Sequence, residues 1–179
     1  DPPAPAVLQV GQATVIKGRE VTIPVTVTGN PGFAAMNFKI DYDKTRLKLT
    51  GFEDAGLTDW EVGINSGEKA AWLDEKNFSE DGPILTLKFT VLDNAEVGMA
   101  EIALTVLCAA DLEEKDVLFD SVAGGVNVVE RFPGDVDDNG IVNIVDALRL
   151  KKYLAGFSVE INSFNADVNG DDTADALDL

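Results

Sequence analysis

Two twelve-residue segments place an oxygen-bearing side chain at almost every second position, DVDDNGIVNIVD at 135–146 and DVNGDDTADALD at 167–178. Carboxylates held this close repel one another unless a cation lies among them. The spacing is that of an EF-hand calcium loop, whose ligands come from positions 1, 3, 5, 7, 9 and 12, with a sharp turn at position 6. Oxygen-only ligation with a flexible geometry suits calcium better than magnesium. Both segments are therefore predicted to fold around Ca2+.

Both segments fill all the ligand positions. In the first loop these are Asp135, Asp137, Asn139, the carbonyl of Ile141, Asn143 and Asp146. In the second loop they are Asp167, Asn169, Asp171, the carbonyl of Thr173, Asp175 and Asp178. Position 6 is Gly140 in the first loop but Asp172 in the second, and a non-glycine residue in left-handed backbone costs about 1 kcal/mol. We expect two calcium sites, the second weaker; the other interpretation is a solvated acidic turn that caps a helix.

The composition becomes acidic and helical towards the end of the chain. Residues 133–179 hold ten acidic and three basic side chains. The run IVDALRLKKYLAG at 144–156 repeats apolar residues at helical spacing and ends in the glycine that typically follows a helix. We expect a short hinge at 131–134 and a small α module at 135–179, here called the acidic module. Its second repeat is expected to be truncated, because the sequence stops before a second helix.

The preceding part of the chain has the pattern of a β-sandwich. Three prolines in residues 1–6 indicate an extended linker. Residues 7–130, here called the β domain, contain short segments of alternating apolar and polar residues, such as EVTIPVTVT at 20–28 and AMNFKIDYD at 35–43. Such strands, separated by turns, favour a mainly β fold of the jelly-roll type. The lone cysteine, Cys108, has apolar or small neighbours, and we expect it to be buried.

Charge and residue usage exclude several classes of function. A formal net charge of −18 repels phosphate, so neither nucleic acid nor an anionic membrane is an expected partner. The chain has no histidine, which rules out Ser-His-Asp and Cys-His catalysis and histidine-based zinc sites. No apolar run approaches the roughly 20 residues that span a bilayer. We predict a non-catalytic protein.

Two calcium loops about thirty residues apart, each leading into a helix without one before it, resemble the dockerin domains of cellulosomes. The match is carried by GDVDDNGIVNIVDALRLKKYLAG and by NADVNGDDTADALDL. Residues 7–130 resemble a cohesin, through GREVTIPVTVTGNPGFAAMNFKIDYDKTRLKLTGF, DGPILTLKFTVL and GGVNVVE. The resemblance implies a secreted, extracellular adaptor scaffoldin of a cell-surface cellulosome. Its cohesin would bind the dockerin of an enzyme or other subunit, and its dockerin would dock into the cohesin of another scaffoldin.

The resemblance also implies which residues contact these partners. Loop positions 10 and 11, with positions 17 and 18, tend to contact the cohesin in this family. They correspond to Ile144, Val145, Lys151 and Lys152 in the first repeat and to Ala176 and Leu177 in the second. On the cohesin side, Asn37 matches a strand that meets the dockerin, and its alternation with Met36 and Phe38 directs it to the outer face. Glu113, in the loop ADLEEKD before the closing strand, is the second candidate.

Three other functions are compatible with parts of the sequence. A carbohydrate-binding β-sandwich with a calcium-binding tail would use Trp60 and Trp72 as a sugar-stacking platform, although tryptophans in small β domains usually belong to the core. Trp60 is the one expected to be partly exposed. A glycoside hydrolase needs a carboxylate pair, and none is legible. A calcium sensor needs paired, Met-rich helices, and the acidic module has no methionine.

Overall fold

The computed structural model describes residues 5–64 and 67–179. The chain divides after Val128 into two compact units. The first contains the β domain, which ends two residues earlier than expected, and the second contains the acidic module together with residues 129–134. Of the linker expected at 1–6, residues 1–4 lie outside the described part. Ala6 is not in a linker, because it is the buried first residue of a strand.

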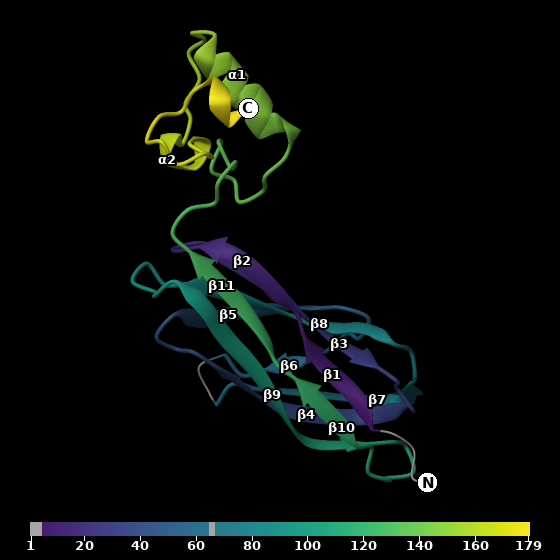
Figure 1. Cartoon of the computed structure of the whole chain (residues 1–179). Helices are drawn as coiled ribbons and strands as arrows, with labels where there is room; N and C mark the ends of the chain where they lie inside the picture. The colour runs from purple at the N-terminus through teal and green to yellow at the C-terminus, as the bar shows by residue number, and fades with distance from the viewer. Residues whose placement is uncertain (1–4, 65–66) are drawn as a thin grey trace. The chain divides into compact units, whose positions relative to one another are not determined.

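The β domain is a sandwich of two sheets, as predicted (Figure 1). The five-stranded sheet has the order β10 (Phe119–Val122), β1 (Ala6–Val10), β3 (Glu20–Thr28), β8 (Gly82–Val91) and β5 (Leu47–Asp54). The six-stranded sheet has the order β2 (Gln12–Ile16), β11 (Gly124–Val129), β9 (Gly98–Ala110), β4 (Phe33–Tyr42), β7 (Lys69–Phe78) and β6 (Glu61–Val62). The pairs β1–β3, β3–β8, β5–β8, β4–β7, β4–β9, β6–β7 and β9–β11 are antiparallel, whereas β1 and β10 run parallel.

The core between the sheets follows from the alternation in the sequence. In β4, Met36, Phe38 and Ile40 are buried, whereas the residues between them lie on the outer face. Aromatic rings fill the centre: Phe38 lies 5.5 Å from Trp60, measured between ring centroids. Burial of a large aromatic side chain is among the strongest contributions to a core, so this inner layer fixes the orientation of β4.

A β-bulge between β4 and β9 overturns the expectation that Cys108 is buried. The register pairs Asn37 with Cys108 but Phe38 with Val106, so Leu107 has no opposite residue. An extra residue in one strand makes two consecutive side chains face the same side. Leu107 and Cys108 are both exposed as a result.

The acidic module is built around one helix and a small core. Helix α1 spans Ile144–Leu154; α2 (Ser163–Ala166) and the 3-10 helix η1 (Ala176–Asp178) are single turns. Asn143 caps α1 by accepting a hydrogen bond from the backbone N–H of Val145, and Asp146 completes a capping box. The buried apolar residues are Val136, Leu150 and Ala166.

The segment expected to be a hinge is bound to the acidic module instead. The N–H of Phe132 donates to Asn165 Oδ1 at 3.0 Å, and the N–H of Gly134 donates to the Asn165 carbonyl at 2.8 Å. Arg131 Nη1 donates to the Asp167 carbonyl at 3.2 Å, and its guanidinium lies 5.4 Å from the ring centre of Phe164. Residues 131–134 therefore have partners that a free hinge lacks.

Candidate calcium loops and docking surfaces

The first loop is organised by a fully buried carboxylate. Asp135 has 0% of its surface exposed. Its Oδ1 accepts a hydrogen bond from the N–H of Asn139 at 3.0 Å, and its Oδ2 accepts from the N–H of Gly140 at 2.8 Å. Two charge-assisted bonds thus bend the chain sharply around the side chain at position 1.

The carboxylate at position 12 closes the same loop. Asp146 is 2% exposed. Its Oδ1 accepts from the N–H groups of Val136 at 2.8 Å and Asp137 at 3.2 Å, and its Oδ2 accepts from the N–H of Asn143 at 2.9 Å. One side chain therefore joins the entry of the loop to the start of α1.

The first loop fits a hard cation. One oxygen from each of Asp135, Asp137 and Asp146 lies within 4.8 Å of the others. Oδ1 of Asp137 is buried and has no hydrogen-bond partner among the described residues, and the nearby Arg149 Nε is 4.0 Å from its Oδ2. Three acceptor-only side chains that converge in this way need a positive charge between them. Calcium, which prefers carboxylate and carbonyl oxygens, matches this donor set.

The remaining ligand residues of the first loop lie on its exposed rim. Asn139 Oδ1 accepts from the N–H of Ile141 at 2.8 Å. Asn143 Oδ1 accepts from Val145 at 2.8 Å, as the helix cap requires. These bonds order the rim through local turns of the Asx type.

The second loop repeats this hydrogen-bond scheme position by position. Asp167, 5% exposed, receives the N–H groups of Gly170 at 2.7 Å and Asp171 at 3.1 Å on Oδ1. Its Oδ2 receives the N–H of Asp172 at 3.0 Å. Asp171 Oδ1 accepts from Thr173 at 3.0 Å, which corresponds to the Asn139–Ile141 bond of the first loop.

Asp178 takes the place of Asp146 in the second loop. Its Oδ1 accepts from Val168 at 2.9 Å and Asn169 at 3.1 Å, and its Oδ2 accepts from Asp175 at 2.8 Å. The backbone N–H of Asp175, and then those of Asn169 and Val168, hold the pKa of the Asp178 carboxyl below its usual value. The charged form is thus the one that the loop stabilises.

Both loops need left-handed backbone at positions 4 and 6. The first loop has Asp138 with φ 59° and Gly140 with φ 85°, and the second has Gly170 with φ 79° and Asp172 with φ 66°. Each loop thus has one glycine and one aspartate at these two positions, in opposite order. The sequence predicted a backbone penalty for the second loop only, from Asp172 at position 6. Because Asp138 takes the same left-handed backbone at position 4 of the first loop, the penalty applies to both loops.

The loops differ in how closely their carboxylates gather. Among the described residues, only the first loop brings three carboxylates within metal-binding distance. In the second loop Asn169 Nδ2 donates to Asp171 Oδ2 at 3.0 Å, so two expected ligands face each other. Asp167 is its buried ligand; Asp171 is exposed.

Helix α1 presents an apolar stripe with two cations at its end, here called the α1 face. Ile144 is 81% exposed, Val145 49% and Leu148 51%. Lys151 and Lys152 are exposed in the last turn and form no ion pair with the described residues. Leu148 was missed as a surface residue by sequence reasoning, although it lies one turn from both Ile144 and Val145.

The second repeat offers a smaller surface. Leu177 is 77% exposed and Ala176 is exposed, but both lie in the three-residue η1. A single 3-10 turn presents fewer side chains on one face than an eleven-residue helix does.

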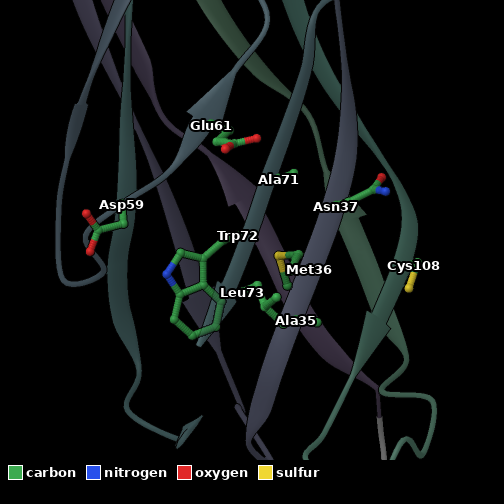
Figure 2. A pocket seen from close by; sticks show the side chains of 9 residues that line it. All are labelled: Ala35, Met36, Asn37, Asp59, Glu61, Ala71, Trp72, Leu73 and Cys108. Atoms are coloured by element: carbon green, nitrogen blue, oxygen red, sulfur yellow. The ribbon is translucent and has the colours of Figure 1, made fainter. Parts of the chain in front are cut away.

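The outer face of the six-stranded sheet carries a shallow groove, here called the sheet groove. Its volume is about 430 Å³, and Figure 2 shows the residues that line it: Ala35, Met36, Asn37, Asp59, Glu61, Ala71, Trp72, Leu73 and Cys108. Pairing places Glu61, Ala71, Asn37 and Cys108 in one row across β6, β7, β4 and β9. The Asn37 Oδ1 is buried and has no hydrogen-bond partner among the described residues.

Glu113 lies in a tight turn beyond the end of β9. Oδ1 of Asp111 accepts from the N–H groups of Glu113 at 2.8 Å and Lys115 at 3.0 Å. Lys115 Nζ lies 2.5 Å from Glu113 Oε2, and both side chains are more than 70% exposed. The turn also exposes Leu112, of which 53% is accessible.

The tryptophans form no sugar-stacking platform. Trp60 is 4% and Trp72 5% exposed. Trp60 Nε1 donates to the Ile84 carbonyl at 2.9 Å, and Trp72 Nε1 donates to the Thr58 carbonyl at 2.9 Å. The expected partial exposure of Trp60 is wrong, because its indole is inserted between the sheets and bonded there.

Among the described residues, no helix is long and apolar enough to cross a bilayer.

Comparisons with family models match both parts of the chain. Residues 6–128 match the cohesin domain, and residues 133–179 match the dockerin type I domain. The cellulose-binding protein A of Clostridium cellulovorans is 28% identical over 66% of this chain. The cellulosomal-scaffolding protein A of Acetivibrio thermocellus is 26% identical over 75% of it. The chain corresponds to only 7% and 8% of the length of these relatives.

Solved structures match the β domain. A type I cohesin–dockerin complex from Clostridium thermocellum aligns with a TM-score of 0.62 and 18% identity, over 70% of this chain and 100% of that one. A non-cellulosomal cohesin from the archaeon Archaeoglobus fulgidus aligns with a TM-score of 0.60 and 20% identity, over 70% and 92%. The same sandwich thus occurs in a cohesin–dockerin complex and in a non-cellulosomal cohesin, so the fold alone does not specify the partner.

Proposed function

Because the chain belongs to the cohesin family through residues 6–128 and carries a type I dockerin at 133–179, we propose that it is an adaptor scaffoldin. Its cohesin binds a dockerin borne by another subunit, and its dockerin docks into the cohesin of another scaffoldin. Both domain types are non-catalytic scaffolding modules. Cellulosomal components are extracellular, and we place this adaptor in a secreted, cell-surface complex.

One observation carries the proposal: each of the two domains exposes a separate surface that is suited to binding a partner. The sheet groove contains a buried oxygen of Asn37 that has no partner among the described residues, and the α1 face leaves Ile144 81% exposed. An unsatisfied buried acceptor costs about 1–3 kcal/mol. A partner that donates to Asn37 would remove this cost.

We assign two calcium ions to the dockerin, with the first loop as the stronger site. Asp135, Asp137 and Asp146 would hold the first ion, with Asn139, Asn143 and the Ile141 carbonyl on the rim. Asp167, Asn169, Asp171, Asp175, Asp178 and the Thr173 carbonyl would hold the second. The ion supplies positive charge where the carboxylates converge. The chain's own residues set the loop shape and the first turn of α1.

We assign external docking to the first repeat alone. Ile144 and Val145 supply the apolar anchor, and Lys151 and Lys152 meet an acidic partner. Replacing Ile144 and Val145 with Asp is expected to abolish binding to the external cohesin. The matched change of Ala176 and Leu177 to Asp, at the same positions of the second repeat, is expected to cost much less. Equal losses would indicate that both repeats dock.

The test of the adaptor role is simultaneous binding. Calorimetry of the full chain against panels of type I cohesins and dockerins, with calcium and with EDTA, is expected to identify one partner for each domain. The external cohesin should require calcium, and both partners should bind the chain together as a ternary complex. Asn37→Ala and Glu113→Lys should weaken only dockerin capture. Competition between the two partners, or no binding to either panel, would refute the proposal.

A further inference from the structure

We propose that this chain also associates with further copies of itself, head to tail, by docking the α1 face of one copy into the sheet groove of the next. The inference rests on the proposed function, because it uses the same two surfaces. What it adds is the identity of one partner: a second copy of this chain.

The sheet groove combines an apolar floor with an acidic side. Ala35 and Ala71 keep the floor low, and Leu73, 78% exposed, stands beside it. Asp59 and Glu61 are exposed on the side of the groove away from Asn37 and Cys108, and they form no ion pair with the described residues (Figure 2). A partner for this groove therefore needs an apolar stripe with cations next to it.

The α1 face has that composition. Ile144 and Leu148 form the stripe, one turn apart, and Lys151 and Lys152 follow at its C-terminal end. From Ile144 to Lys152 the helix rises about 12 Å at 1.5 Å per residue. The apolar stripe of the α1 face can contact the apolar part of the sheet groove, and its two lysines can then meet the acidic side of the groove. The two surfaces are therefore complementary.

The overall charge of the chain opposes self-association only weakly. Each copy has a formal net charge of −18. At physiological ionic strength, however, charges more than about 8 Å apart are largely screened. The contact is therefore decided by the charges that meet at the surface, and there lysines oppose carboxylates.

The position of the groove along its sheet favours a contact between copies. Asn37 pairs with Cys108, whereas Val128, where the β domain ends, pairs with Gly98. The ten residue steps of β9 from Gly98 to Cys108 cover about 33 Å at 3.3 Å per residue. The groove thus lies at the end of β9 remote from the point where the chain leaves the domain. A head-to-tail contact leaves one free groove and one free α1 face, so association can continue beyond a dimer.

The test is sedimentation velocity of the full chain with calcium over a range of concentrations. Wild type is expected to form species larger than dimers as concentration rises, and EDTA should reduce them. Leu73→Asp disables the groove, and Ile144→Asp disables the α1 face; each variant alone should stay monomeric. Mixed together they should form a 1:1 dimer that does not grow, because only one complementary contact remains.

Control variants separate a lost contact from a lost fold. Val122→Asp, an exposed apolar position on the other sheet, and Leu154→Asp, at the end of α1 outside the stripe, should associate like wild type. Reversing both lysines, Lys151→Glu with Lys152→Glu, should weaken self-association at least tenfold. Tryptophan fluorescence and helix signal establish that each variant is folded.

The proposal is overturned if wild type remains a monomer at every concentration, if mixing the two variants does not restore a dimer, or if wild type stops at a symmetric dimer. A monomeric chain that still captures other cohesins and dockerins would leave the adaptor role intact. A chain that binds no cohesin or dockerin at all would remove both.

Discussion

Replacing Asp146 with Ala is expected to unfold the acidic module while leaving the β domain intact. The Asp146 carboxylate is 2% exposed and receives the backbone N–H groups of Val136, Asp137 and Asn143. Alanine removes both carboxylate oxygens, so all three N–H groups lose their acceptor together. The same change removes the capping box at the start of α1.

The magnitude follows from these bonds. A buried donor left without a partner costs about 1–3 kcal/mol, which applies to the buried N–H of Val136; the part-buried N–H groups of Asp137 and Asn143 add less, because water can reach them. Typical stabilities of about 0.05–0.15 kcal/mol per residue predict only about 3–8 kcal/mol for a module of this size. The lost calcium ligand acts in the same direction, so this estimate is a lower bound. The substitution therefore removes a large part of the stability of the module.

The assay uses the unequal distribution of chromophores. Trp60 and Trp72 both lie in the β domain, so tryptophan fluorescence reports that domain alone, whereas the helix signal at 222 nm comes from α1. In thermal melts with saturating calcium, Asp146→Ala should shift or abolish the helix transition and leave the fluorescence transition unchanged. Asp146→Asn should lie in between, because its Oδ1 can still accept.

The matched control is Asp178→Ala, the equivalent position of the second loop. Asp178 receives as many N–H groups, but at a surface where water can replace the lost acceptors. Its effect on the helix signal should be clearly smaller. If Asp146→Ala melts like wild type, or if the two alanine variants lose the same stability, the buried-carboxylate argument is wrong.

Three further predictions follow from individual contacts. Chelating calcium should reduce the helix signal without changing tryptophan fluorescence, because the clustered loop carboxylates repel once the ion is removed; equal signals with and without EDTA would count against it. Arg131→Ala should lower the melting temperature of the acidic module slightly, through about 1 kcal/mol from the lost contacts with Phe164 and the Asp167 carbonyl, while Arg131→Lys should recover part of it. The backbone N–H of Asn30, and then that of Gly29, lower the pKa of Asp81 below 3.8, so its contribution to stability is present above that pH and is lost as the pH falls through the lowered folded value. A carboxyl NMR titration in which Asp81 titrates at or above 3.8 would contradict this reasoning.

The regular part of the structure was predictable because its signals are local. Alternation in AMNFKIDYD directed Met36 and Phe38 inward, and the structure buries both. The spacing of carboxylates and amides defined the two loops, and the apolar repeat after Asn143 located α1. Each of these signals needs only neighbouring residues, so one sequence is enough to read it.

The sequence predictions were wrong where residues far apart in the chain determine burial or hydrogen bonding. Cys108 faces outward because the register against β4 slips by one residue, and nothing within β9 alone signals that slip. Trp60 is buried because its indole bonds to the carbonyl of Ile84, 24 positions away. The hinge is not free because Asn165, 33 positions from Phe132, accepts its N–H. Only tertiary pairing reveals such constraints.

The two candidate calcium loops share one hydrogen-bond scheme but are connected to different parts of the molecule. In the first loop, Asp146 joins the loop directly to α1, so order in that loop is passed to the helix that we propose docks. In the second, the Asp167 carbonyl holds Arg131, next to the β domain in the sequence. Calcium in the first loop should therefore govern docking affinity, whereas the second should govern how firmly residues 131–134 are held. A weaker second site is sufficient to hold residues 131–134. The bond from the Phe132 N–H to Asn165 forms although the second loop does not gather three carboxylates as the first loop does.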